Sequence, residues 1–97
     1  MSIEIQHDLV NHAFTAKVSG EISQLQYRKI DDQTLDYYRT FVPETLRNHG
    51  IASKLTQHAL EYALANNYHI IPSCSYVDSY IERHPEYAHL IKKNCRT

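Results

Sequence analysis

The segment from Val42 to Ala52 holds the residues with the clearest chemical potential in the chain. It joins a stretch of strand-forming residues to an amphipathic helix, and Gly50 stands at the junction. The start of a helix presents backbone N–H groups without acceptors and the positive end of the helix dipole. Such a junction can bind phosphate or pyrophosphate, and Gly50 would let the backbone approach the anion closely. Arg47 and His49 would add side-chain donors beside the loop.

The same spacing also fits an ordinary turn with a glycine before a helix, and the residues alone do not decide between the two interpretations. The segment is not a P-loop, because the required pair of glycines followed by lysine is absent. It is not a dinucleotide-binding fingerprint either, because that motif needs three glycines. The whole chain has only two, Gly20 and Gly50.

Cys74 is the second candidate for chemistry. It stands just before a predicted helix, whose first N–H groups would lower the pKa of the thiol and favour a nucleophile. The alternative is a small buried apolar residue, which is the commonest role of a free cysteine. Tyr76 and Tyr80 carry hydroxyls that could protonate a leaving group, although a chain with eight tyrosines uses most of them for packing. Cys95 is expected to be an incidental exposed thiol.

The seven histidines do not form a metal-binding pattern. No two of them stand four residues apart on a predicted helix, and no Cys-x-x-Cys pair accompanies them. We therefore predict no metal site. His84 directly precedes Pro85 and is expected to fix the turn between the last two helical segments rather than to act as a base.

Composition limits the class of protein. The 97 residues allow one domain, with 10 basic and 11 acidic side chains and a net charge of −1. That charge argues against a nucleic-acid binder, which usually has a basic surface. No apolar run is long enough for a membrane span, and the first residues do not resemble a signal peptide. Two cysteines do not make a disulfide framework, so a cytoplasmic location is expected.

The spacing of apolar residues predicts which elements position these groups. A short strand over Ile3–His7 should be followed by a half-buried strand over Ala13–Val18. Two longer strands are predicted over Ile22–Ile30 and Thr34–Val42. The apolar residues of the last strand fall on both of its faces, which predicts a strand covered on both sides. Pro43 should end it.

The second half of the chain changes to a helical period. A helix of roughly four turns should end at Asn66–Asn67, because asparagine tolerates left-handed backbone. A strand over Tyr68–Ile71 and a helix to His84, capped by Ser73 or Ser75, should follow. A strand–helix–strand crossover makes its two strands parallel. The predicted fold class is α/β (α+β), with an antiparallel meander, then strand–helix–strand in a mixed sheet, and a C-terminal helix.

Five short motifs, taken in order and spacing, resemble a known family. The segment from Arg47 to Ala52 looks like the pyrophosphate loop, [QR]-x-x-G-x-[GA], of the GNAT acyltransferase superfamily. The chain resembles more specifically the small GNAT-like family of that superfamily. The matching pieces between about Leu25 and Ile91 are Tyr27-Arg28, Thr40 to Pro43, Arg47 to Leu55, Pro72 to Tyr76 and Arg83 to Tyr87.

This resemblance implies a GNAT-like sheet with acetyl-CoA as cosubstrate. The strand before the loop would pair with the pantetheine arm through Phe41 and Val42, and a nearby N–H would polarise the thioester carbonyl. Cys74 would lie near the thioester as a nucleophile or acyl acceptor, and Tyr76 would protonate the leaving thiolate. The amides that would hold the pyrophosphate belong to Arg47, Asn48, His49, Gly50, Ile51 and Ala52.

Two positions depart from the pattern of the small family. Asn48 stands where that family usually has a first glycine, a position that the superfamily loop leaves open. Arg39 stands where the small family usually has histidine, so no acid–base role is carried over to that position.

We therefore expect residues 1–97 to form a single minimal GNAT-like domain that transfers an acetyl group from acetyl-CoA to an amine or thiol. The sequence does not say whether the acceptor is a small molecule or a protein. The short chain predicts an acceptor groove that is open or completed by a partner chain, so homo-oligomerisation stays open. The alternative is a non-catalytic CoA-binding or interaction module. An RNA-binding ferredoxin-like domain is disfavoured, because the RNP1 pattern and a basic charge are missing.

Overall fold

The computed structural model describes residues 3–91, and Cys95 lies outside the described residues. Five strands form one sheet in the order β1-β2-β3-β4-β5. The first four strands pair antiparallel and β5 pairs parallel with β4, so the predicted mixed sheet with an antiparallel meander is confirmed. The strands are β1 (Ile5–Asp8), β2 (Ala13–Val18), β3 (Glu21–Asp31), β4 (Thr34–Phe41) and β5 (His69–Ile71).

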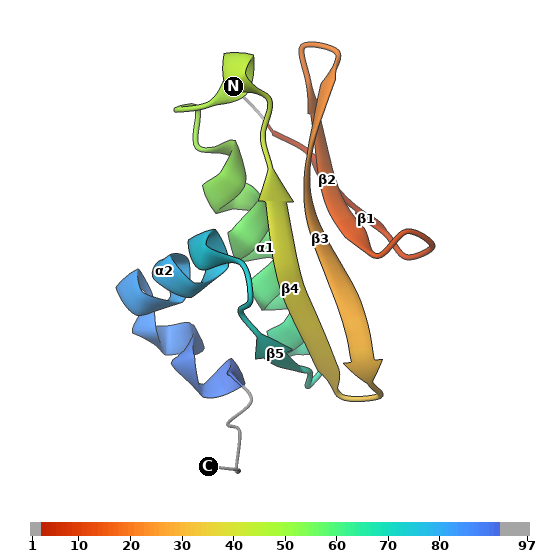
Figure 1. The fold of residues 1–97 in the computed structure, drawn as a ribbon, viewed down its shortest axis with the longest axis vertical. Helices are drawn as coiled ribbons and strands as arrows, with labels where there is room; N and C mark the ends of the chain where they lie inside the picture. The colour runs from red at the N-terminus through yellow and green to blue at the C-terminus, as the bar shows by residue number, and fades with distance from the viewer. Residues whose placement is uncertain (1–2, 92–97) are drawn as a thin grey trace.

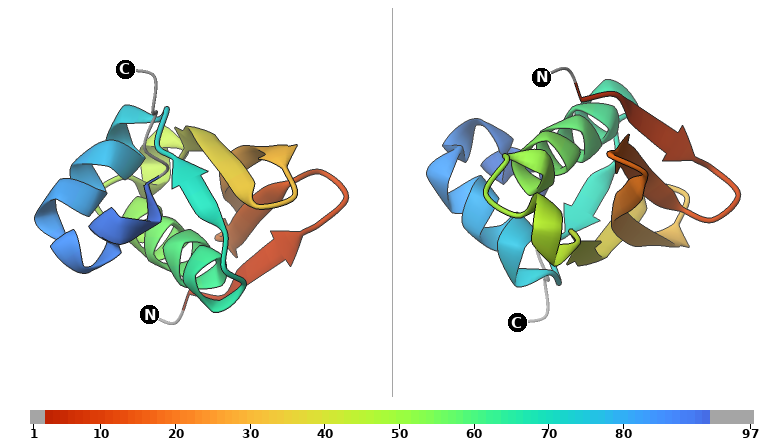
Figure 2. Two further views of the ribbon diagram at one scale, coloured as in Figure 1. Left: turned by 90° about the horizontal axis from the view of Figure 1, so that it is seen from below. Right: turned by 90° about the horizontal axis from the view of Figure 1, so that it is seen from above.

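One long helix provides the crossover between the two parallel strands. Helix α1 (Ile51–Ala65) connects β4 to β5 and lies along one face of the sheet, behind it in Figure 1 and beside its curved strands in both views of Figure 2. Helix α2 (Ser75–Arg83) follows β5 and packs on α1 and β4. Short 3₁₀ helices at Glu44–Leu46 and Pro85–Leu90 precede α1 and follow α2. The predicted strand–helix–strand unit and C-terminal helix are confirmed.

The hydrophobic core lies between the sheet and α1. Alternate residues of β2 and β3 are buried as predicted, and α1 meets them with one apolar face. The Tyr37 hydroxyl crosses this core and donates a hydrogen bond of 2.7 Å to the carbonyl of Ala59. The fully buried side chains include Phe14, Leu25, Leu35, Tyr37, Leu55, Leu60 and Ile70.

The ends of the helices agree with the sequence in two places and differ in one. Asn67 takes a φ of 60° after α1, as expected for a helix stop. The Nδ1–H of His84 donates to the carbonyl of Tyr80 at 2.8 Å and the two rings stack, so His84 fixes the turn as predicted. The serine cap predicted for α2 is wrong, because Cys74 is the N-cap residue. The N–H of Cys74 donates to the carbonyl of Tyr37, which holds Cys74 in extended backbone at the edge of the sheet.

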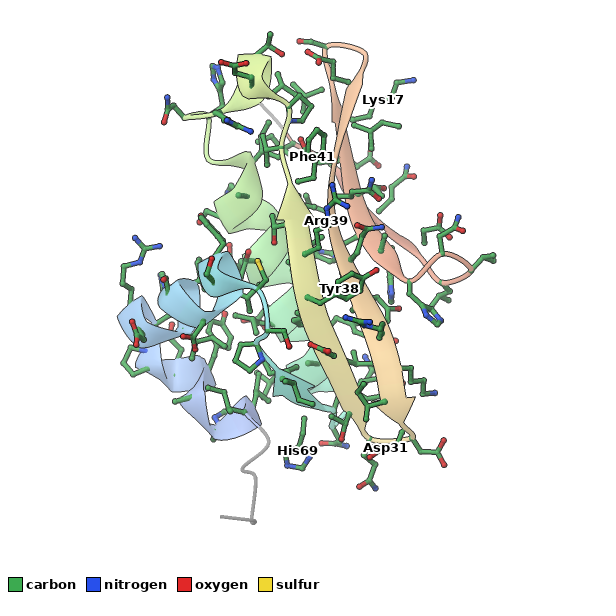
Figure 3. The ribbon with its side chains drawn as sticks, in the orientation of Figure 1. Lys17, Asp31, Tyr38, Arg39, Phe41 and His69 are labelled. Atoms are coloured by element: carbon green, nitrogen blue, oxygen red, sulfur yellow. The ribbon has the colours of Figure 1, made fainter. Side chains whose placement is uncertain are left out.

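A bulge in β4 changes which residues reach each side of the sheet. Tyr27 pairs with Tyr37 and its neighbour Gln26 pairs with Arg39, so Tyr38 is an extra residue in β4. Figure 3 shows Tyr38 and Arg39 one after the other along this strand. Beyond Tyr38, the β4 positions that would face α1 in a regular strand therefore face outward, and the others face α1.

The prediction that β4 is covered on both faces is wrong, and the bulge explains why the sequence suggested it. Thr40 pairs with the fully buried Leu25 and faces α1, while the neighbouring Phe41 faces outward and is 40% exposed. Within residues 3–91, no helix covers this outer face. When strict alternation is applied to β4 without the bulge, its apolar residues fall on two faces. That distribution does not mean that a second layer covers the strand.

An aromatic cluster ties β1 to the rest of the fold. His7 stacks on Phe14 with 4.2 Å between ring centroids and meets Tyr62 of α1 edge-on at 4.4 Å. The ring also forms a hydrogen bond of 2.6 Å with the Tyr27 hydroxyl. Burial lowers the pKa of His7, and His58 lowers it further, with Asp8 opposing and His12 adding to the effect.

Acidification is expected to destabilise the protein through His7. Because the pKa of His7 is lowered in the folded state, its neutral form stabilises the fold above the ordinary value of 6.5, and this contribution is lost as the pH falls below it. Urea unfolding midpoints at about pH 7.5 and 5 should show this loss. His7→Phe keeps a stacking ring and should reduce the pH dependence, whereas His89→Gln at an exposed position should not. An equal pH dependence in His7→Phe and the parent chain would refute the assignment.

Candidate functional site

A cleft of about 430 Å³ opens where β4 and β5 part. The two strands pair only as far as Asp36 and Ile71, and the last backbone hydrogen bond runs from Cys74 N–H to the carbonyl of Tyr37. Beyond it, the end of β4 has no strand partner on this side among residues 3–91. The cleft is lined by Thr40, Phe41, Val42, Leu46, Arg47, Asn48, Gly50, Ile51, Ala52, Ser53 and Tyr76.

The start of α1 forms one wall of this cleft. Gly50 is the N-cap residue, with a φ of 76°, and no side chain caps the helix. The first intrahelical bond runs from Lys54 N–H to the carbonyl of Gly50, so the earlier N–H groups precede the helix ladder. The first turn contains no acidic residue that would neutralise the dipole. This wall therefore offers backbone donors and positive potential to an anion.

The loop before α1 is held at both ends. Leu46 is buried in the core, and the Thr45 hydroxyl donates a 2.5 Å hydrogen bond to the carboxylate of Glu21 at the start of β3. The Nε–H of Arg47 donates to the carbonyl of Val42 at 3.3 Å. Among the residues that the structure describes, Arg47 is the one charged residue that lines the cleft.

Asn48, which stands where the small family usually has a glycine, adopts a backbone conformation typical of glycine. Its φ is 71°, in the left-handed region that glycine adopts freely and that asparagine tolerates better than most residues. The amide side chain thus stands at a position where the backbone requires positive φ. Glycine and asparagine are interchangeable here for the same conformational reason.

Asn48→Gly is therefore expected to be neutral or stabilising, by up to about 1 kcal/mol. A β-branched residue should do the opposite, and Asn48→Val should lower the unfolding free energy by about 1–2 kcal/mol. Urea unfolding of the two variants beside the parent measures the difference. If both variants had the same stability, positive φ would not explain the residue at this position.

Cys74 lies beside the far end of the cleft, in contact with Thr40, and is not itself one of the lining residues. The Thr40 hydroxyl lies 3.4 Å from the Cys74 sulfur, and Thr40 and Tyr76 both line the cleft. Cys74 is half-buried and packs against the hydrophobic core, so its burial fits both the nucleophile and the packing interpretation. It stands at the start of α2, where the helix begins.

The surroundings of Cys74 favour its thiolate. Burial alone would raise the pKa of the thiol, but the Thr40 hydroxyl and the backbone N–H groups of Val77 and Tyr76 lower it, and the net direction is downward. The sulfur makes no side-chain capping bond of ordinary geometry to α2. We therefore attribute the effect of those amides to the field of the helix start.

Most of the residues predicted from the sequence meet in the cleft. Seven of the eight positions implied for the cosubstrate line it: Phe41, Val42, Arg47, Asn48, Gly50, Ile51 and Ala52. His49 is exposed and does not line it, so a contact from His49 stays a prediction. Tyr76 lines the cleft, whereas Tyr80 is buried away from it.

Three lining residues were absent from the predicted site: Thr40, Leu46 and Ser53. Thr40 lies within the motif Thr40 to Pro43, but only the bulge at Tyr38 turns it toward the cleft. Ser53 could have been found from its place in the first turn of the helix, three residues after Gly50.

Other sites are less suited to an anion. A larger cavity of about 690 Å³ lies at the other end of β4, between Asp31, Asp32, His69 and His89, and its carboxylates would repel a phosphate. Residues 3–91 contain no group of three or more histidine, cysteine or acidic side chains placed to hold a metal ion. Within the same residues, no helix is long and apolar enough to cross a membrane.

Comparison with known proteins agrees with this geometry. Residues 13–90 match the family described as GCN5-related N-acetyl-transferase. The fold is similar to the NMR structure of a "GCN5-like putative N-acetyltransferase" from Staphylococcus aureus, with a TM-score of 0.73 and 24% sequence identity. That similarity covers 96% of this chain and 91% of the other. The match of the family extends over both walls of the cleft.

Proposed function

This chain belongs to the GCN5-related N-acetyltransferase family, and we propose that its cleft binds acetyl-CoA for transfer of the acetyl group to an amine or thiol acceptor. The observation that carries the proposal is the uncapped start of α1 in the wall of a cleft that the open edge of β4 completes. An anion-binding helix start and a free strand edge are the two features that a pyrophosphate joined to an amide-containing arm requires.

The loop supplies the proposed pyrophosphate site. The backbone N–H groups of Gly50, Ile51 and Ala52 are the proposed donors, and positive φ at Asn48 and Gly50 shapes the loop around them. Arg47 adds a cation at the cleft mouth. A methyl group at Gly50 would meet no protein atom within 4 Å, and because Gly50 lines the cleft, we propose that the space beside it is the space that the anion occupies.

The other end of the cleft supplies the proposed acyl-transfer chemistry. The open edge of β4 at Phe41 and Val42 would pair with the amide-containing arm, and a backbone N–H there would stabilise charge on the carbonyl oxygen. The Cys74 thiolate would attack the acetyl carbonyl carbon, forming an S-acetyl bond as the bond to the departing sulfur breaks. Tyr76 would give its hydroxyl proton to that sulfur and recover one from water. The acetyl group would then pass from Cys74 to the acceptor.

A non-catalytic CoA-binding module remains the second candidate, because the cleft geometry serves binding whether or not transfer follows. Calorimetric titrations with acetyl-CoA and with acetyl-pantetheine, which lacks the pyrophosphate, test the binding step. We expect acetyl-CoA to bind at least about tenfold more tightly, because charge-assisted bonds to the loop are lost in the shorter ligand. Equal affinities would refute the loop assignment. Binding without CoA release in the presence of a panel of primary amines and thiols would favour the module.

A further inference from the structure

We propose that Thr40 is a positioning residue for Cys74, whose hydroxyl orients the thiol beside the cleft and stabilises its reactive form. The inference rests on the proposed function, since it gives Thr40 a role in the same acyl transfer. The Thr40 oxygen and Cys74 sulfur are 3.4 Å apart, across the gap between β4 and the start of α2. Thr40 also lines the cleft and would border the proposed ligand, whereas Cys74 stands behind it and is not a lining residue.

The bulge is what makes this contact. In an unbroken β4, positions 37 and 40 would face opposite sides of the sheet. The extra residue at Tyr38 restores Thr40 to the side that Tyr37 and Leu25 share, which is the side of Cys74. The backbone hydrogen bond from Cys74 N–H to the carbonyl of Tyr37 fixes the backbone of Cys74 at the same place. Cys74 is thus held both through its backbone N–H and through its sulfur.

The hydrogen bond changes character when the thiol ionises. With a neutral thiol, either atom can be the donor. A thiolate has no proton to give, so the Thr40 hydroxyl must donate, and a bond to a charged acceptor is stronger than a neutral one. The hydroxyl therefore stabilises the thiolate more than the thiol. No bond to Thr40 forms or breaks during transfer, and the hydroxyl keeps its proton.

The direct test is the pH profile of Cys74 alkylation by iodoacetamide, in a Cys95→Ser background so that one thiol reacts. Thr40→Val removes the hydroxyl and keeps the branched shape. We expect alkylation at about pH 7 to slow by about three- to tenfold, with the profile moved to higher pH. The rate at high pH should approach that of the parent, because every thiol is then ionised. Thr40→Ser should restore the parent profile.

Thr15→Val is the matched control, because Thr15 is also a strand threonine but lies in β2, away from the cleft. It should leave the profile unchanged. The proposal is overturned if Thr40→Val keeps the parent profile, if Thr40→Ser fails to restore it, or if the variant slows the reaction equally at every pH. Amide spectra of each variant establish that it folds. Alkylation needs no acetyl-CoA, so failure of the proposed function appears separately, as absent binding in the titration of the parent chain.

Discussion

Gly50→Ala is expected to lower the affinity for acetyl-CoA by at least about tenfold, measured by calorimetric titration. The added methyl group would stand between the anion and the N–H groups at the start of α1. Inside the protein the same methyl group meets no atom within 4 Å, so it has room in the free chain. The cost to folding is that of alanine at positive φ, about 1–2 kcal/mol. If Gly50→Ala loses more affinity for acetyl-CoA than a control variant at the other glycine, the difference would therefore come from the changed pyrophosphate loop.

Gly20 provides that control. It has a φ of 79° in the turn between β2 and β3, and a methyl group there also meets no atom within 4 Å. Gly20→Ala carries the same backbone cost as Gly50→Ala but lies outside the cleft. It should lose similar stability and keep the affinity of the parent chain. Equal affinities in the two variants would contradict the assigned pyrophosphate loop.

Cys74→Ser is expected to reduce acetylation of the chain by acetyl-CoA by at least about a hundredfold. Serine keeps the size of the side chain, but its hydroxyl does not ionise near neutral pH and is a much weaker nucleophile. Affinity for acetyl-CoA should change little, because the cleft is lined by Thr40 and Tyr76 rather than by the cysteine. Intact mass after incubation with acetyl-CoA, followed by peptide mapping, measures the acetyl group on residue 74.

The control for this experiment is Cys95→Ser, which should leave acetylation at residue 74 unchanged. A Cys74→Ser chain that still releases CoA at the parent rate to an amine acceptor would show that the thiol is not the nucleophile. If the parent chain binds acetyl-CoA but neither becomes acetylated nor releases CoA, the non-catalytic module is the better description. The first result would contradict the assignment of Cys74 as the nucleophile, and the second would contradict the proposed transferase activity.

The sequence predicted the architecture because local signals and long-range packing agree. Alternation in β2 and the three- and four-residue spacing of α1 mark the two faces that form the core. The position of the loop was predictable for a similar reason, since Gly50 lies between a strand pattern and a helix pattern. Its positive φ was not predicted and is seen only in the structure. Motif order then predicted the family that the match over residues 13–90 shows.

What the sequence could not predict depends on contacts between distant segments. The bulge at Tyr38 appears only in the pairing of β4 with β3, and without it Thr40 would face away from Cys74. The cap of α2 was missed because propensity favours serine, whereas a hydrogen bond from Cys74 to Tyr37 decides where the helix begins. The corner of the site that would carry chemistry is therefore the part that required tertiary structure.

The most direct test of the central claim is an amide chemical-shift titration of the parent chain with acetyl-CoA. The proposed site predicts that the largest shifts fall on residues 47–53, at the start of α1, and on residues 40–42, at the open edge of β4. Amides around the acidic cavity near Asp31 and His69 should stay unchanged. Saturating acetyl-CoA that leaves residues 47–53 unshifted would contradict the assignment of this cleft as the cosubstrate site.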